Sequence, residues 1–117
     1  MLLDETNVIQ FEDFLKVDIR AGTILAVQLN TKAKKPAYIL KIDFGELGIK
    51  MSSAQVTENY EAEQLIGKQI VAVMNFPIKR IAGIKSEVLV LACVNDSLLV
   101  PVLLQPSFVV PIGSRIL

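Results

Sequence analysis

Five apolar stretches, each bounded by polar turns, constrain the fold of this chain more than any other feature of its sequence. They cover residues 17–29, 37–45, 49–53, 68–76 and 84–94; four of them are rich in Val and Ile, and the third has Ile49 and Met51. These residue types favour a pleated, half-buried strand. Gly22 interrupts the first stretch, and a glycine inside a strand often marks a bulge or a sharp bend. The pattern therefore predicts five strands, with a bend in the first.

Side chains alternate in the second and third predicted strands, as they do when one face of a sheet is buried. In the second strand, the predicted core positions are Tyr38, Leu40, Ile42 and Phe44, while Lys41 and Asp43 point outward. In the third strand, Ile49, Met51 and Ser53 share one face, whereas Lys50 and Ser52 share the other. Each of these strands thus projects one lysine, Lys41 or Lys50.

Two short helices and a proline-rich tail complete the pattern. Apolar residues from Ile9 to Leu15 fall near helical spacing, with Asn7 as an N-cap. Thr57 can cap a second helical stretch that runs to Leu65 and ends before Gly67. The tail Leu98–Leu117 has a proline every five residues, so it can form only short or edge strands.

Five strands with one helix between the third and the fourth follow the order of an OB-fold, a small Greek-key barrel. The predicted fold is therefore all-β: a five-stranded OB-fold Greek-key barrel with a short N-terminal helix, a short helix between strands 3 and 4, and a C-terminal extension. The 117 residues are enough for one core, so residues 1–117 are predicted to form a single domain.

Composition argues against most enzyme classes. The chain has no histidine, which removes the commonest general base and most zinc sites. We therefore expect no catalytic residues, no metal and no cofactor, and a carboxylate- or lysine-dependent enzyme is the weaker alternative. The single cysteine, Cys93, lies in an apolar run and is expected to be a buried small hydrophobe. One cysteine suits a reducing compartment, which indicates a cytoplasmic protein.

The start of the chain and its apolar runs bear on targeting. Asp4 and Glu5 lie where a signal peptide would carry positive charge, so no signal peptide is expected. Prolines and charged residues interrupt every long apolar run, and we therefore expect no membrane insertion.

The positive charges are segregated, although 12 basic and 12 acidic residues cancel. The segment from Lys68 to Ser86 carries Lys68, Lys79, Arg80 and Lys85 and no acid. An OB-fold binds through strands 2 and 3 and through the loops that join strands 1 and 2 and strands 4 and 5. The first loop carries Lys32, Lys34 and Lys35, and the second carries Lys79, Arg80 and Lys85. Together with Lys41 and Lys50, these loop residues predict one basic face that binds a nucleic-acid backbone. The alternative is that the loops are ordinary solvated loops.

Three segments carry a resemblance to a known family. They are residues 17–24, the pair 42–45 and 52–55, and residues 75–87, where Asn75-Phe76-Pro77 is followed by Lys79-Arg80 and Lys85-Ser86-Glu87. The chain resembles, over residues 11–117, the tRNA-binding domain family, an OB-fold module found in endothelial-monocyte-activating-type polypeptides and appended to some aminoacyl-tRNA synthetases. The sequences of residues 52–55 and 75–77 are most similar to those of the free-standing CsaA-type members. Those relatives are dimeric cytoplasmic chaperones associated with protein export that also bind tRNA.

The resemblance implies further RNA-contacting residues. It adds Ser52, Gln55, Asn75 and Ser86 to the lysines and Arg80, although an asparagine at a strand end can equally bond the nearby backbone. The predicted RNA-binding set is Lys32, Lys34, Lys35, Lys41, Lys50, Ser52, Gln55, Asn75, Lys79, Arg80, Lys85 and Ser86. An alternative function is a dedicated tRNA-binding module that assists an aminoacyl-tRNA synthetase in trans.

High hydrophobicity points to a covered apolar surface. Hydrophobic residues make up 52% of the chain, which is much for a small soluble monomer. We expect a homodimer formed through Leu98–Leu117 and the N-terminal helix with Phe11 and Phe14. A groove lined by Met51, Phe76, Ile78, Ile81 and Ile84 is predicted to bind unfolded or precursor polypeptides, unless these residues pack into the barrel or the interface. The predicted function is thus a CsaA-like chaperone that also binds tRNA.

Overall fold

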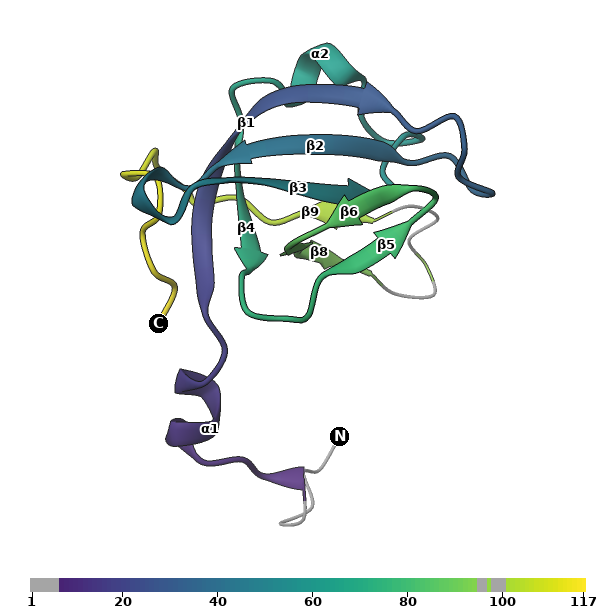
Figure 1. Ribbon diagram of the computed structural model, residues 1–117. Coiled ribbons are helices and arrows are strands. Elements are labelled where there is room, and N and C mark those ends of the chain that lie inside the picture. Colours follow the sequence, from purple (N-terminus) through teal and green to yellow (C-terminus); the bar gives the residue numbers. More distant parts are fainter. Residues whose placement is uncertain (1–6, 95–96, 98–100) are drawn as a thin grey trace.

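The computed structural model describes residues 7–94, 97 and 101–117. A five-stranded antiparallel sheet in the order β3-β2-β1-β4-β7 curls into a nearly closed barrel (Figure 1). Its strands are β1 (Ile19–Leu29), β2 (Tyr38–Asp43), β3 (Ile49–Ala54), β4 (Gln69–Val73) and β7 (Leu89–Val90). The predicted all-β barrel of the OB type is thereby confirmed.

Short elements decorate the barrel. The helices are α1 (Phe11–Leu15), the 3-10 turn η2 (Gly45–Leu47) and α2 (Ala62–Leu65), which lies between β3 and β4 as predicted. Two small hairpins pair β5 (Lys79–Ile81) with β6 (Ile84–Ser86), and β8 (Ala92–Cys93) with β9 (Val102–Leu103). No helix in the described part of the chain has the length and apolar character needed to cross a membrane.

Strand β1 is bent because it serves both halves of the barrel. Its first half pairs with β4 and its second half with β2, and the register shifts between Ile24 and Ala26. The sequence predicted this irregularity at Gly22, but the structure places it further along the strand. Gly22 has another role: a Cβ there would lie 2.6 Å from Cε1 of Phe44. The glycine leaves room for a core aromatic ring.

The core confirms most of the predicted alternation. Leu40, Ile42 and Phe44 are fully buried, together with Ile24, Leu65 and Ile70. Tyr38 is only half-buried, and its hydroxyl donates a hydrogen bond to the Tyr60 carbonyl at 2.9 Å. On β3 the inward side is the one that carries Ser52, because Leu40 pairs with Ser52 in the β2–β3 ladder.

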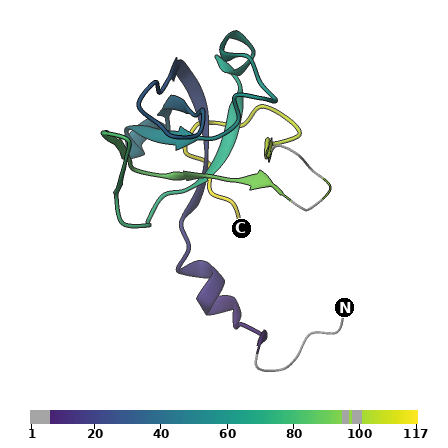
Figure 2. The same cartoon turned by 90° about the vertical axis from the view of Figure 1, so that its right-hand side faces the viewer.

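Both helices begin later than the sequence predicted. The N-cap of α1 is Gln10 instead of Asn7, and its N–H donates to the Asp13 carboxylate at 2.9 Å. The N-cap of α2 is Glu61, whose N–H donates to Oε1 of Gln64 at 3.0 Å. In both cases a polar side chain in the first turn reaches back to an unpaired backbone N–H. Figures 1 and 2 show α1 standing away from the barrel.

The predicted fifth strand, residues 84–94, is divided into β6, β7 and β8. The loop predicted between strands 4 and 5, which carries Lys79, Arg80 and Lys85, forms the β5–β6 hairpin. Ala82 and Gly83 join the two strands with positive φ values of 48° and 82°. A two-residue turn with both φ values positive suits the right-handed twist of a hairpin. Cys93, on β8, is exposed, so its predicted burial is wrong.

The C-terminal tail lies along the first half of β1. The N–H of Gly113 donates to the Ala21 carbonyl at 2.8 Å, and the N–H of Ile116 donates to the Ile19 carbonyl at 2.9 Å. Gln69 holds the tail from β4, because its amide donates to the Val110 carbonyl at 2.8 Å and accepts from the Val110 N–H at 2.9 Å. The first residues of the predicted extension, 98–100, lie outside the described residues.

Replacing Gln69 with Glu tests this clamp. A carboxylate cannot donate to the Val110 carbonyl, and it places a charge beside that oxygen. We expect Gln69→Glu to lower the free energy of unfolding by about 1–3 kcal/mol. Urea denaturation measures the loss. Gln28→Glu is the matched control, because Gln28 is exposed on β1 and should change stability by no more than about 0.5 kcal/mol. Equal stabilities of the two variants would contradict the clamp.

Candidate nucleic-acid and polypeptide interface

Three hollows meet at Ser53 on β3. The first, which we call the basic hollow, has a volume of about 500 Å³ and is lined by Lys32, Ala33, Lys34, Lys35, Ala37, Ser53, Gln55, Ile81 and Ala82. The second, the apolar hollow, has about 440 Å³ and is lined by Ser53, Phe76, Pro77, Lys79, Ile81, Ser86, Glu87, Val88 and Leu89. The third, the slit, has about 310 Å³ and lies between β3 and β7, with Ala54, Gln55, Leu89, Val90 and Leu91 in its lining. Ser53 lines all three, so the hollows adjoin one another at this residue.

The basic hollow joins the two cationic connections that the sequence singled out. The β1–β2 loop supplies its three lysines, and the turn of the β5–β6 hairpin supplies Ala82. The Cδ of Lys32 lies 3.9 Å from the position that a Cβ on Gly83 would take. The two connections thus lie side by side, as predicted. The lining of the basic hollow contains three lysines and no acidic side chain, so the local charge is positive.

Asn30 organises the lysine loop, and the sequence analysis missed it. Its side chain is buried at the end of β1, and Oδ1 accepts from the Lys32 N–H at 3.1 Å. Its backbone N–H donates to the Ala37 carbonyl at 2.9 Å, which closes the loop. An asparagine that bonds the backbone two residues on is a recognised turn former. Asn30 directly before Thr31-Lys32 was the available signal.

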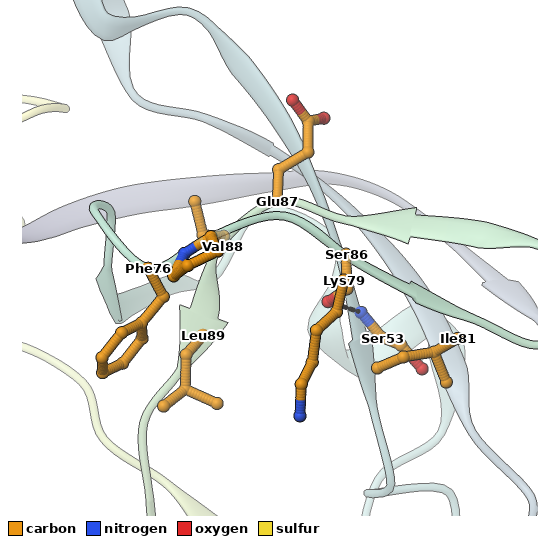
Figure 3. A pocket seen from close by; sticks show the side chains of 9 residues that line it. Ser53, Phe76, Lys79, Ile81, Ser86, Glu87, Val88 and Leu89 are labelled. Carbon is orange, nitrogen blue, oxygen red and sulfur yellow. Dashed lines mark hydrogen bonds between the residues drawn. The ribbon is translucent and has the colours of Figure 1, made fainter.

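The apolar hollow is walled by hydrophobic side chains and has one cation at its mouth. Figure 3 shows Phe76, Leu89 and Lys79 projecting in the same direction, whereas Glu87 points away from them. The Phe76 side chain is 52% exposed and so remains available to a ligand. The sequence predicted Phe76 and Ile81 for this site, but Met51, Ile78 and Ile84 do not line it. Leu89 does line it, although the sequence analysis placed this residue only in the fifth predicted strand.

The cations of the hairpin divide between its two faces. In the β5–β6 register, Lys79 pairs with Ser86 and Ile81 with Ile84, and these residues share the face toward the apolar hollow. Arg80 pairs with Lys85, and alternation places both on the opposite face. Arg80 and Lys85 line neither the basic nor the apolar hollow, so their contact with RNA stays a prediction.

Lys41 and Lys50 lie on opposite faces of the sheet. Lys41 pairs with Met51, whereas Lys50 pairs with the buried Ile42. Paired residues share a face, so Lys50 belongs to the inward side at the start of β3 and Lys41 is exposed on the outer side. The prediction that both project toward one partner is therefore wrong. With the β2–β3 register known, the alternation of side chains along each strand places Lys41 and Lys50 on different faces.

Two of the predicted contact serines hold the barrel together. Ser52 is 1% exposed, and its hydroxyl donates to the Val88 carbonyl at 2.9 Å. It is too deeply buried to reach RNA, so its predicted RNA contact is wrong. Ser86 is half-buried, and its Oγ accepts from the Ser53 N–H at 3.1 Å. Gln55 is exposed and lines the basic hollow, as its prediction requires.

Asn75 ties the end of β4 to the start of β1. Its Oδ1 accepts from the Asp18 N–H at 3.0 Å, and its Nδ2 donates to the Lys16 carbonyl at 2.7 Å. Arg20 lies nearby and pairs with Asp18 at 2.6 Å. Both ends of the Asn75 amide are thus engaged within the fold, although the residue is exposed.

Asn75→Ala separates the two roles proposed for this residue. The variant loses two hydrogen bonds, so we expect the free energy of unfolding to fall by about 1–2 kcal/mol. Because Asn75 lines neither hollow, tRNA affinity should change less than about twofold, well under 1 kcal/mol. Urea denaturation and fluorescence anisotropy measure the two quantities. A large loss of tRNA affinity at unchanged stability would instead support a direct RNA contact.

Among the described residues, no group of three or more His, Cys, Asp or Glu side chains is placed to hold a metal ion. The described surface offers lysine ammonium groups in the basic hollow and apolar walls in the apolar hollow.

Comparison with known proteins agrees with this geometry. The family model described as "Putative tRNA binding domain" matches residues 19–115. Chaperone CsaA from Bacillus anthracis shares 54% identity and a TM-score of 0.87, with 93% of this chain and 98% of that chain covered. The CsaA chaperone protein from Picrophilus torridus shares 47% identity and a TM-score of 0.85, covering 94% and 100%.

Larger relatives contain a similar unit. The chain is 40% identical over 101 residues to methionine–tRNA ligase of Methanococcoides burtonii, and 36% identical over 108 residues to that of Porphyromonas gingivalis. These alignments cover 86% and 92% of this chain, but only 14% and 15% of the ligases. The chain therefore matches a small part of those enzymes. From the family model and the shared fold together, the chain belongs to the tRNA-binding domain family.

Proposed function

We propose that this chain binds tRNA, with the phosphate backbone seated on the basic hollow. The observation that carries the proposal is the convergence of Lys32, Lys34 and Lys35 on one concavity without an acidic neighbour in its lining. None of the three forms an ion pair with another described residue. Each is free to neutralise a phosphate and release its counterions. The proposed role is therefore binding, which we place in the cytoplasm and expect to need no cofactor.

Fluorescence anisotropy with labelled tRNA tests the proposal. Binding should weaken steeply between about 50 and 200 mM KCl, because counterion release makes the affinity depend on salt. No binding at the lowest salt, or binding that salt leaves unchanged, would contradict a backbone contact.

A second function is favoured by the apolar hollow. Exposed apolar concavities of this kind mark sites for partners. We propose that unfolded or precursor polypeptides bind there, with Phe76, Ile81 and Leu89 as the apolar walls and Lys79 facing an acidic group of the client. The CsaA proteins are named chaperones, which supports this proposal. A role in protein export remains an expectation from the resemblance.

Phe76→Ser should weaken client binding because it removes an aromatic wall. We expect a loss of about 3- to 10-fold in affinity for a denatured client, on the order of 1 kcal/mol. Stability should hardly change, since Phe76 is 52% exposed. Ile66→Ser, at the end of α2, is the matched control, because Ile66 is 51% exposed and lines none of the three hollows. The measurement is how well each variant, at equal concentration, suppresses aggregation of the client. Equal suppression by the two variants would contradict client binding in the apolar hollow.

We also propose a homodimer formed through the tail and α1. Phe108 and Val109 are 85% and 89% exposed, and Phe11 is 65% exposed, with no buried residue in α1. Arg115 ties the two elements together, because its guanidinium donates to the Leu15 carbonyl at 2.8 Å. A two-fold interface would cover this apolar surface. Light scattering after size-exclusion chromatography reports the mass, and a monomer at micromolar concentration would refute the interface.

The alternative function, assistance to an aminoacyl-tRNA synthetase in trans, draws on the ligase relatives. Adding the chain to a synthetase that lacks this domain should then raise its apparent affinity for tRNA. No effect on aminoacylation would favour the chaperone role.

A further inference from the structure

We propose that the slit between β3 and β7 receives an extended polypeptide segment as an added β-strand. This inference deepens the polypeptide binding proposed above and rests on it. The two strands end the sheet order and are not paired with each other along the slit. Their facing edges therefore decide what the slit can hold.

The edge of β3 is closed at one end and open at the other. Met51 is closed off by Glu87, whose N–H donates to the Met51 carbonyl at 2.8 Å and whose carboxylate accepts from the Met51 N–H at 3.1 Å. The Ser53 N–H donates to Oγ of Ser86. Alternate residues of a strand direct their backbone groups to the same side, so Gln55 is next in this row. Within the described chain, no hydrogen bond reaches the Ser53 carbonyl or the backbone of Gln55.

The edge of β7 presents a matching residue. The Leu91 N–H donates to the Val71 carbonyl at 2.9 Å, so Leu91 is turned toward β4. Leu89 pairs with Val73 in the same ladder, two residues away. Val90 lies between them and therefore directs its N–H and carbonyl away from β4, into the slit. No described residue bonds to these two groups, although Val90 lines the slit opposite Gln55.

The strand directions allow one added strand to be antiparallel to both edges. Each neighbouring pair in the order β3-β2-β1-β4-β7 is antiparallel, so β3 and β7 run the same way. A segment that runs the opposite way is antiparallel to both. Its own N–H and carbonyl groups alternate between its two sides, and they would satisfy those of Gln55 on one side and Val90 on the other.

Recognition by backbone groups would be largely independent of the client's sequence. The slit shares Ser53 and Leu89 with the apolar hollow, so a neighbouring side chain of the same segment can enter that hollow. An extended, unfolded polypeptide fits this surface. Folded proteins do not, because their backbone groups are already paired.

The test uses a fluorescein-labelled decapeptide in which leucine and serine alternate. Gln55→Pro removes the Gln55 N–H, which no described residue uses, and Gln55→Ala removes the same side chain but keeps that N–H. We expect Gln55→Pro to bind the peptide about fivefold more weakly than Gln55→Ala, the effect of one hydrogen bond. Equal affinities of the two variants would contradict strand addition.

Amide hydrogen exchange of the wild-type protein gives a second readout that needs no variant. Saturating peptide should protect the N–H groups of Gln55 and Val90 by about tenfold or more. Peptide binding without this protection would overturn strand addition and leave docking in the apolar hollow. Failure of the wild type to bind the peptide would overturn both that proposal and this one. Equal protection by a single-stranded oligouridylate would assign the slit to RNA instead.

Discussion

Replacing Lys32, Lys34 and Lys35 together with alanine is expected to weaken tRNA binding by about 10- to 100-fold near 0.1 M salt. The three side chains surround one concavity, so a phosphate backbone seated there loses all three neutralising charges at once. The slope of the logarithm of the affinity against the logarithm of salt concentration should also fall by about 2–3. Fluorescence anisotropy over a range of KCl concentrations measures both quantities.

Two comparisons make this result specific. Arg80→Ala with Lys85→Ala removes two charges from the other face of the hairpin and should cost less affinity per charge. Lys16→Ala removes a charge at the C-cap of α1, which stands away from the barrel, and should change the slope little (Figure 1). If all variants weaken binding in proportion to the charge removed, tRNA recognises net charge and not the basic hollow.

Gly22→Ala is expected to destabilise the barrel by about 3 kcal/mol, a large share of the stability of a small domain. The added Cβ would lie 2.6 Å from Cε1 of Phe44 and 2.7 Å from Cγ2 of Ile42. Both neighbours are fully buried, so neither can move aside without disturbing the core. Urea denaturation followed by circular dichroism gives the change in free energy of unfolding.

A second substitution checks the cause. Phe44→Leu removes the ring atoms that the new Cβ would meet, so Gly22→Ala should cost less in the Phe44→Leu background than in the wild type. The coupling energy between the two sites should be about 1–2 kcal/mol. Additive effects would show that the cost of Gly22→Ala comes from another source, such as the backbone of β1.

The barrel was predictable because strand alternation and strand order leave local marks in the sequence. Leu40, Ile42 and Phe44 alternate with polar residues, and all three are buried. The bend in β1 was predicted at Gly22, where a glycine interrupts the strand, but the register shifts after Ile24. Packing decided this difference: the space left by Gly22 belongs to Phe44, a residue 22 positions away that no local pattern connects with it.

The candidate site was predicted only in part, because it depends on pairings between distant segments. The proximity of the lysine loop to the hairpin followed from the expected OB-fold and is confirmed by the basic hollow. The separation of Lys79 from Arg80 and Lys85 required the β5–β6 register. The burial of Ser52 required the closure of β3 against the segment near Val88. Sequence patterns give the period of a strand, whereas the face that becomes buried is set by its partners.

The most direct test of the central claim is a backbone amide NMR map of the protein titrated with tRNA. Binding at the basic hollow predicts the largest shift changes in the lysine loop, residues 30–37, and at the hairpin turn, residues 81–84. Changes confined to the opposite end of the barrel, at residues 45–48 and 111–114, would contradict it.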